Sequence, residues 1–192
     1  AFAKQMFQSP SGLILVTGPT GAGKTTTLYA ALSAIEGWDN TLNIVTIEDP
    51  VEHNLKFATQ IQVNRELNLD FPNILRTILR QDPDVILVGE IRDTESAAMA
   101  LEAAMTGHLV LSSLHTYSAL ETLVRLQDLE VKPYLLASAL KGVISQQLLP
   151  RLQPGATEPV SPRAPVVERL KAMGILEADW SGTLYHGKEV KG

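Results

Sequence analysis

Cysteine is absent from the 192-residue sequence, which excludes disulfide bonds and zinc sites built on thiolates. The four histidines are not closely spaced, so we expect no zinc site and no other structural metal site. No apolar run approaches the roughly 18 to 20 residues that a membrane-spanning helix needs, and the N-terminus lacks the pattern of a signal peptide. We therefore expect a cytoplasmic protein without a transmembrane segment.

Aromatic residues are scarce at 5%, and the 16 Lys and Arg residues are scattered along a chain with a net charge of -5. Proteins that bind nucleic acids typically present a clustered basic surface, often with aromatic side chains on which bases stack. This sequence has neither feature. We therefore expect no nucleic-acid partner.

Short apolar segments alternate with amphipathic segments over most of the chain. Strands are predicted at residues 13–16, 44–47, 57–63, 85–88 and 109–111, with 57–63 at the sheet margin. Helices are predicted at residues 24–35, 71–80, 94–105, 119–129 and 133–149. This alternation predicts an α/β fold, in which a mostly parallel sheet is flanked by helices.

The composition changes after residue 152. Residues 153–165 hold four prolines and one glycine, which predicts a linker or an extended surface segment, and residues 165–173 predict one short helix. We expect a main domain at residues 1–152 and a small helical C-terminal appendage at residues 153–192. The chain opens at Ala1 without an initiator methionine, so we expect a fragment of a larger protein.

A glycine-rich segment, Gly18-Pro-Thr-Gly-Ala-Gly-Lys24-Thr25, lies between the first predicted strand and the first predicted helix. Every fixed position of a phosphate-binding loop is present. In such a loop the backbone N–H groups surround phosphate oxygens, the lysine reaches the terminal phosphates and the threonine ligates Mg²⁺. We therefore predict binding of ATP and Mg²⁺, with Thr25 as a metal ligand. The predicted nucleotide-binding residues are Gly18, Pro19, Thr20, Gly21, Ala22, Gly23, Lys24, Thr25 and Thr26.

Acidic residues follow two of the predicted strands. Glu90 comes after strand 85–88 through a glycine, and Glu48 and Asp49 follow strand 44–47. The carboxyl ends of strands are where α/β sheets place ligand-contacting residues, and phosphoryl transfer to water needs a group that holds the attacking water. Helix capping or ion pairing with an arginine such as Arg92 is the alternative role for any one of these acids.

Two histidines flank the predicted strand 109–111. His108 precedes it and His115 follows it, each among small and polar residues. An imidazole at a strand end can contact a terminal phosphate, but it can equally serve as a hydrogen-bonded residue at the rim of a sheet. The sequence leaves both roles open for both residues.

Four segments resemble, in order, the Walker A, aspartate-box, Walker B and histidine-box motifs of the type II secretion and type IV pilus assembly ATPases. They are residues 18–27, 44–52, 79–93 and 106–116, and the resemblance runs from about residue 7 to residue 152. It implies a RecA-like P-loop NTPase core. It also implies a bacterial homohexamer, peripheral at the cytoplasmic face of the inner membrane, that couples ATP turnover to movement of an inner-membrane platform protein.

The resemblance also implies roles for single residues. Glu90 matches the leading catalytic or Mg²⁺-linked acid, and Glu48 matches a second acid in the site. His115 falls in the histidine box, and Arg92 is the one arginine beside the strand-end motifs, so both are catalytic candidates. The stretch 112–114 is more similar to secretion and pilus-extension members than to retraction motors.

The sequence departs from this family in two places. Secretion and extension members commonly carry a cysteine-rich zinc-binding subdomain just after the stretch that matches 149–152, and here the cysteines are absent. Gln147 stands where the family often has an arginine. The family's N-terminal domain, which supplies arginines to the nucleotide, is also missing from this sequence, so we expect weak ATPase activity from the chain alone.

Two other function classes remain open. A RecA-like nucleic-acid translocase would share the phosphate-binding loop, but it would be expected to show basic loops or stacking aromatic residues. A nonhydrolysing nucleotide-binding module with a regulatory role would keep Lys24 without needing Glu90. Turnover measured beside binding distinguishes the second class from an ATPase.

Overall fold

The computed structural model describes residues 2–149, 157–159, 165–173 and 185–187. The chain divides into two compact units, Ala1–Leu148 and Leu149–Gly192. The boundary predicted after residue 152 and most of the predicted linker lie outside the described residues. Within that linker region only 157–159 and Pro165, the first residue of the C-terminal helix, are described.

The first unit is built on a six-stranded sheet with the order β3-β2-β4-β5-β1-β6, in which every pair of neighbouring strands is parallel. Its strands are β1 (Gly12–Thr17), β2 (Ile44–Glu48), β3 (Thr59–Gln62), β4 (Val85–Val88), β5 (Leu109–Leu114) and β6 (Leu140–Ser145). The four central strands are buried along their whole length, whereas β3 and β6 are partly exposed. Burial on both faces explains the continuous apolar runs in the sequence.

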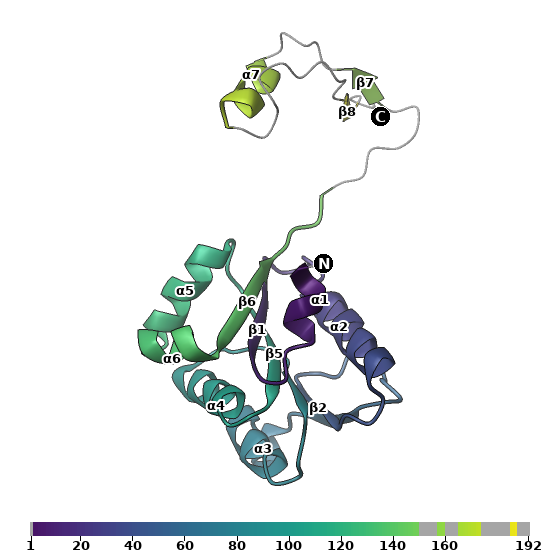
Figure 1. Cartoon of the computed structure of the whole chain (residues 1–192), viewed down its shortest axis with the longest axis vertical. Helices are drawn as coiled ribbons and strands as arrows, with labels where there is room; N and C mark the ends of the chain where they lie inside the picture. The colour runs from purple at the N-terminus through teal and green to yellow at the C-terminus, as the bar shows by residue number, and fades with distance from the viewer. Residues whose placement is uncertain (1, 150–156, 160–164, 174–184, 188–192) are drawn as a thin grey trace. The chain divides into compact units, whose positions relative to one another are not determined.

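Helices cover both faces of this sheet (Figure 1). They are α1 (Phe2–Phe7), α2 (Lys24–Trp38), α3 (Phe71–Ile78), α4 (Thr94–Met105), α5 (Ala119–Asp128) and α6 (Pro133–Ala139), with a short 3-10 helix at Arg65–Leu67. The apolar side of α2 packs with β1, β4 and β5 in one core cluster, and α3, α4 and α6 pack against the sheet in a second cluster. The predicted α/β fold class is therefore confirmed.

Side-chain caps fix the start of two helices near the sheet's carboxyl edge. Asp70 accepts a hydrogen bond from the backbone N–H of Asn73 at the start of α3. Asp93 accepts one from Ser96, and the Ser96 hydroxyl completes a capping box at the start of α4. Asp93 is therefore a helix-capping residue rather than one of the strand-end acids singled out in the sequence.

The predicted helix at residues 133–149 is confirmed only as far as Ala139 and is wrong beyond it. Helix α6 ends at Ala139, and Leu140–Ser145 forms strand β6, which pairs in parallel with β1. Gly142 lies so close to the Met6 side chain that a Cβ at this position would overlap the Met6 sulfur atom. The free edge of β1 and the low helix propensity of glycine favour a strand here, and neither is visible in the local apolar pattern.

The second unit contains helix α7 (Pro165–Ala172) and a two-stranded antiparallel sheet of β7 (Thr157–Pro159) and β8 (Tyr185–Gly187). The helix was predicted, and the two short strands were not. None of the described helices in either unit is long and apolar enough to cross a membrane.

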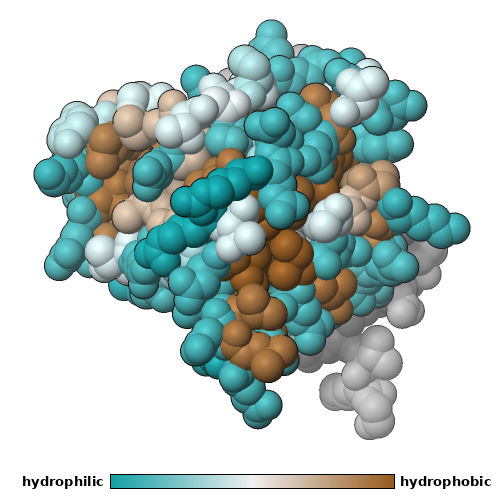
Figure 2. All heavy atoms as spheres, turned by 90° about the horizontal axis from the view of Figure 1, so that it is seen from below, coloured by the Kyte–Doolittle hydropathy of each residue, from teal (hydrophilic) through white to brown (hydrophobic). Residues whose placement is uncertain are grey.

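The surface of the first unit at the end where α3 lies is mostly hydrophilic, with separate hydrophobic areas among polar side chains (Figure 2). The large exposed apolar side chains of this unit, such as Leu67 and Met105, come from different elements. Single exposed apolar residues are ordinary on a protein surface, so these side chains give no indication of function.

Candidate functional site

The glycine-rich loop leaves β1 and enters α2. Gly18, Gly21 and Gly23 have φ angles of 153°, 78° and 82°, which residues with a Cβ rarely adopt. Lys24 is the first residue of α2. The glycines therefore let the chain turn sharply, so that the N-terminus of a 15-residue helix lies at the carboxyl end of a buried strand.

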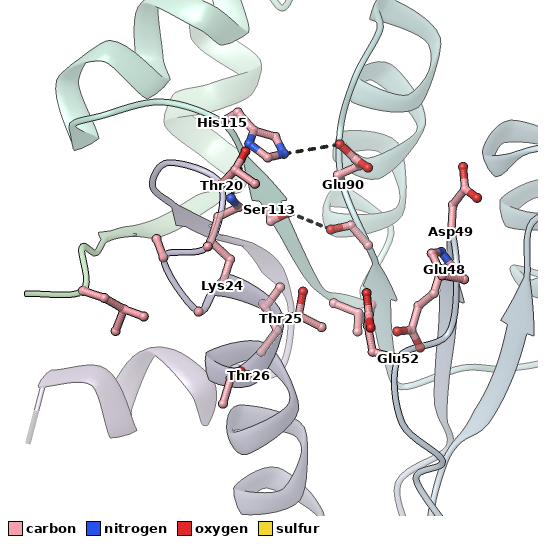
Figure 3. Close-up of a pocket in the computed structure, with 18 of the residues that line it drawn as sticks. Thr20, Lys24, Thr25, Thr26, Glu48, Asp49, Glu52, Glu90, Ser113 and His115 are labelled. Atoms are coloured by element: carbon pink, nitrogen blue, oxygen red, sulfur yellow. Dashed lines mark hydrogen bonds and ion pairs between the residues drawn. The ribbon is translucent and has the colours of Figure 1, made fainter.

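This loop forms one wall of a cavity of about 570 Å³. The opposite wall comes from the carboxyl ends of three neighbouring strands and the turns after them. Glu48 is the last residue of β2, and Asp49 and Glu52 follow it. Glu90 follows β4, Ser113 lies near the end of β5, and His115 follows β5. Figure 3 shows the loop residues on one side and the acidic residues on the other. The crevice at the carboxyl ends of parallel strands is where open α/β sheets bind ligands.

Lys24 is buried and its amino group is held by its own loop. The Nζ atom donates hydrogen bonds to the carbonyl oxygens of Gly18 at 3.0 Å and Pro19 at 3.1 Å. It also lies 3.4 Å from Nδ1 of His115. Burial lowers the pKa of Lys24, while the charge of Glu90 opposes this effect. A phosphate group that enters the loop must compete with these carbonyl oxygens for the lysine.

Glu90 faces the cavity from the end of β4. Its carboxylate forms a close ion pair with Arg92, and its Oε2 lies 3.6 Å from Nε2 of His115. The hydrogen bond from Arg92 is the main cause that lowers the pKa of Glu90, and the nearby charges of His115 and Lys24 act in the same direction. Glu90 therefore carries a negative charge at neutral pH.

Arg92 lies beside the cavity and bridges two strand ends. Besides Glu90 it approaches Asp49, with 3.8 Å between Nη1 and Oδ2, and Arg65 approaches the same Asp49 oxygen at 3.5 Å. The partner Glu90 is also the main reason that the pKa of Arg92 is raised. In this arrangement the guanidinium of Arg92 is engaged by protein carboxylates rather than directed into the cavity.

Glu48 has a different environment from Glu90, because it is only 3% exposed. Its carboxylate accepts hydrogen bonds from Thr46 Oγ1 at 2.6 Å, from Gln60 Nε2 at 3.1 Å and from the Tyr29 hydroxyl at close range. The pKa of Tyr29 is raised to about 12, mainly by burial and next by the hydrogen bond that its hydroxyl donates to Glu48. Three donors therefore hold Glu48 in one position at the edge of the cavity.

The donor set of the cavity suits Mg²⁺ when the ion is shared with phosphate oxygens. Thr25 and Glu90 both line the cavity, and the described residues contain no group of three or more His, Cys, Asp or Glu side chains placed to hold a metal alone. Mg²⁺ is usually bound through one or two carboxylates together with substrate phosphates and water. Thr25 and an acid at the strand ends fit that pattern.

The two histidines that the sequence could not distinguish lie at opposite ends of β5. His115 lines the cavity, between Lys24 and Glu90. His108 precedes the strand, and its Nδ1 lies 2.9 Å from the carbonyl oxygen of Ala103 in α4. A phosphate-contacting role for His108 is therefore wrong, because the strand separates it from the loop.

Sequence reasoning missed three residues outside the four motifs that hold the site together. Tyr29 and Gln60 donate to Glu48, and Gln146 contacts the phosphate-binding loop from the end of β6. Tyr29 lies five residues after Lys24, within the same helix, and was assigned only to that helix. Gln60 alternates with apolar residues in an edge strand, and Gln146 fell in a segment predicted to be helical, so no local signal marked either one.

The family comparison covers nearly the whole chain. The sequence matches the family described as Type II/IV secretion system protein over residues 1–187. The type II secretion system protein HxcR of Pseudomonas aeruginosa is 54% identical over 147 residues, which is 77% of this chain and 31% of that protein. The type II secretion system protein E of Pectobacterium carotovorum is 51% identical over 181 residues, which is 94% of this chain and 34% of that protein. The chain thus spans about a third of the length of these curated relatives.

Solved structures with the same fold include the pilus retraction motor PilT with bound ADP, at a TM-score of 0.68 and 41% identity over 77% of this chain and 46% of that one. The VirB11 ATPase of the Brucella suis type IV secretion system, in complex with sulphate, has a TM-score of 0.61 and 26% identity over 74% of this chain and 46% of that one. Both likenesses confirm the predicted RecA-like P-loop core. Together with the match over residues 1–187, they establish that the chain belongs to the Type II/IV secretion system protein family.

Proposed function

We propose that this chain is the ATPase unit of a motor that powers a bacterial type II secretion system or type IV pilus assembly machine. The observation that carries the proposal is the phosphate-binding loop with Lys24 facing the ionised Glu90 across one cavity. Phosphoryl transfer to water depends mainly on positioning and on charge stabilisation, and these residues supply both kinds of group.

The proposed roles follow from where each residue lies. The loop from Gly18 to Thr26 surrounds the phosphates, with Lys24 on the terminal ones, and Thr25 is the protein ligand for Mg²⁺. The bound ion would neutralise phosphate charge. Glu90 orients the attacking water or is linked to the metal through water, because it is ionised and faces the cavity.

Three further residues complete the proposed site. Glu48, fixed by its three donors, is the second acid. His115 lies between Lys24 and Glu90, and it contacts the terminal phosphate or relays the presence of that phosphate. Arg92 holds Glu90 in position while it pairs with that carboxylate and with Asp49.

The charge of the cavity argues for cations from outside this unit. As far as the structure describes the lining, it holds one lysine or arginine, Lys24, against four carboxylates, those of Glu48, Asp49, Glu52 and Glu90. ATP adds further negative charge. Mg²⁺ neutralises part of it, and we propose that an arginine from elsewhere in an assembled homohexamer supplies the rest, as such residues do in related reactions.

The partners proposed for the whole machine rest on its relatives. Proteins about 50% identical to this chain are named type II secretion system protein E, so we propose that the motor lies at the cytoplasmic face of the inner membrane and drives an inner-membrane platform protein. Residues 112–114 resemble secretion and extension motors more than retraction motors, which favours export or pilus extension.

Phosphate release measured against protein concentration tests the proposal. We expect turnover that needs Mg²⁺, that stops when the metal is chelated, and that rises more steeply than protein concentration as subunits complete one another's sites. The same assay with added DNA should give an unchanged rate. Tight MgATP binding without turnover at any concentration, in this chain and in a longer ring-forming protein, would instead indicate a nonhydrolysing nucleotide-binding module.

A further inference from the structure

Gln146, the first residue after β6, contacts the phosphate-binding loop through its main chain and its side chain. Its backbone N–H donates to the carbonyl oxygen of Thr17 at 2.9 Å. Its side-chain Oε1 accepts from Thr27 Oγ1 at 2.8 Å, and its Nε2 donates to the carbonyl oxygen of Ala22 at 2.5 Å. One residue therefore contacts the chain before the loop, the loop itself and the first turn of α2.

Gly18 of the loop lies too close to Gln146 to carry a side chain. A Cβ on Gly18 would overlap the carbonyl oxygen of Gln146. The φ angle of 153° at Gly18 adds a second reason for glycine. A Cβ on Gly23 would lie 3.4 Å from the Gln146 Nε2 atom, which is ordinary contact, so at that position the Gln146 side chain sets no such limit. The start of the loop and the end of β6 thus approach more closely than a side chain at Gly18 would allow.

The bond to Ala22 bears on how the loop binds phosphate. A peptide group is planar and trans, so the carbonyl of Ala22 and the N–H of Gly23 point in opposite directions. By holding the Ala22 carbonyl, the Gln146 amide also fixes the direction of the Gly23 N–H, and Gly23 lines the cavity. The bond to Thr27 ties the same amide to the helix whose N-terminus faces the phosphates.

We infer that Gln146 is a positioning residue, which holds the phosphate-binding loop in the geometry that accepts the nucleotide and thereby links the loop to the end of the first unit. This inference rests on the proposed nucleotide binding, since the loop must have phosphate to receive. The first unit ends at Leu148, two residues beyond Gln146. Because binding linkage is reciprocal, a nucleotide that orders the loop also strengthens the contacts of Gln146 at that end.

The chain offers a matched control in the neighbouring residue. Gln147 is exposed, whereas Gln146 is half-buried against the loop. The experiment compares Gln146→Met with Gln147→Met in the 192-residue chain, using calorimetric titration with MgATP. Methionine keeps the length of glutamine and removes both side-chain hydrogen bonds. We expect Gln146→Met to weaken MgATP binding about tenfold, since two hydrogen bonds are lost, and Gln147→Met to stay within about twofold of the parent.

A second variant keeps the test decisive if Gln146→Met folds poorly. Thr27→Val removes one of the two bonds from the helix side, and we expect it to weaken binding about threefold. Thr27→Val added to Gln146→Met should weaken binding no further, because the shared bond is already lost. A purely structural role would lower the melting temperature of both variants and leave the affinity of the folded protein unchanged.

Each outcome has one meaning. If the parent binds MgATP and both Gln146→Met and Thr27→Val bind it equally well, the inference is overturned while the proposed function stands. If Gln146→Met and Gln147→Met weaken binding alike, the effect is not specific to the loop contact and the inference is again overturned. If the parent chain binds no MgATP, the proposed function fails and this inference fails with it.

Discussion

Replacing Glu90 with glutamine is the sharpest test of the proposed chemistry, because the two side chains have the same shape and differ in charge. In the structure the carboxylate is ionised, pairs with Arg92 and lies 3.6 Å from His115. Glutamine keeps a hydrogen-bond acceptor toward Arg92 but cannot accept a proton from water or balance a metal ion. Groups that transfer a proton in this way typically raise a reaction rate by a factor of about 10² to 10⁴.

We therefore expect Glu90→Gln to lower kcat at least about a hundredfold, which corresponds to roughly 2.7 kcal/mol in the barrier. ATP affinity should stay the same or rise slightly, since one of four carboxylates around the phosphates has lost its charge. Steady-state turnover and calorimetric binding, measured in the ring-forming protein, separate these two effects.

Glu95→Gln is the matched control, because Glu95 forms a 2.8 Å ion pair with Arg76 on the surface, with both side chains more than half exposed. That variant should turn over ATP at the parent rate. A Glu90→Gln protein that keeps its turnover within about tenfold of the parent would refute the catalytic role. If Glu48→Gln then proved the more damaging change, the roles of the two acids would have to be exchanged.

Three other changes have defined outcomes. Lys24→Ala should weaken MgATP binding about tenfold or more in calorimetry, because it removes charge-assisted bonds worth about 1.5 to 3 kcal/mol each, and equal affinity would contradict the loop's role. Tyr29→Phe should lower the free energy of unfolding by about 1.5 to 3 kcal/mol in urea titrations, since it leaves the buried Glu48 with one donor fewer, and an unchanged midpoint would show that the bond contributes little. The pKa of Tyr29 is raised from 10.0 to about 12, so the stability that this shift contributes is complete below pH 10 and is lost as the pH rises toward 12; a pH series of unfolding midpoints should show this loss in the parent and not in Tyr29→Phe.

The phosphate-binding loop could be predicted from the sequence because its chemistry is local. Three glycines with positive φ, a lysine and a threonine stand within eight consecutive residues, and a buried strand and a helix flank them. The position of Glu90 was predictable for a related reason. In a parallel sheet all the strands end at the same edge, so a residue just after a buried strand lies near the loop that follows another one.

The environments of the two acids could not be predicted, because they depend on side chains distant in sequence. Glu48 and Glu90 looked equivalent as acids at strand ends, yet Glu48 is buried among hydroxyl and amide donors while Glu90 is paired with arginine and histidine. Strand β6 was missed for the same reason. Its apolar residues fit a helix as well as a strand, and pairing with the free edge of β1, together with the low helix propensity of Gly142, favours the strand.

The contacts of the site form a continuous series across the sheet, and this constrains how a nucleotide can enter. Lys24 approaches His115, His115 approaches Glu90, and Glu90 pairs with Arg92, which reaches Asp49 after β2. Within this series Lys24 is the cation nearest the loop, and its amino group already bonds two loop carbonyls. A phosphate that attracts the lysine must therefore weaken the contacts of Lys24 with the loop, and the loop then depends more on its contacts with other residues.

Gln146 contacts the loop from the side away from this series, through β6, and its bonds involve no charged group. Lys24 can thus exchange its loop partners for phosphate while the loop keeps the contacts of Gln146, which do not depend on the lysine.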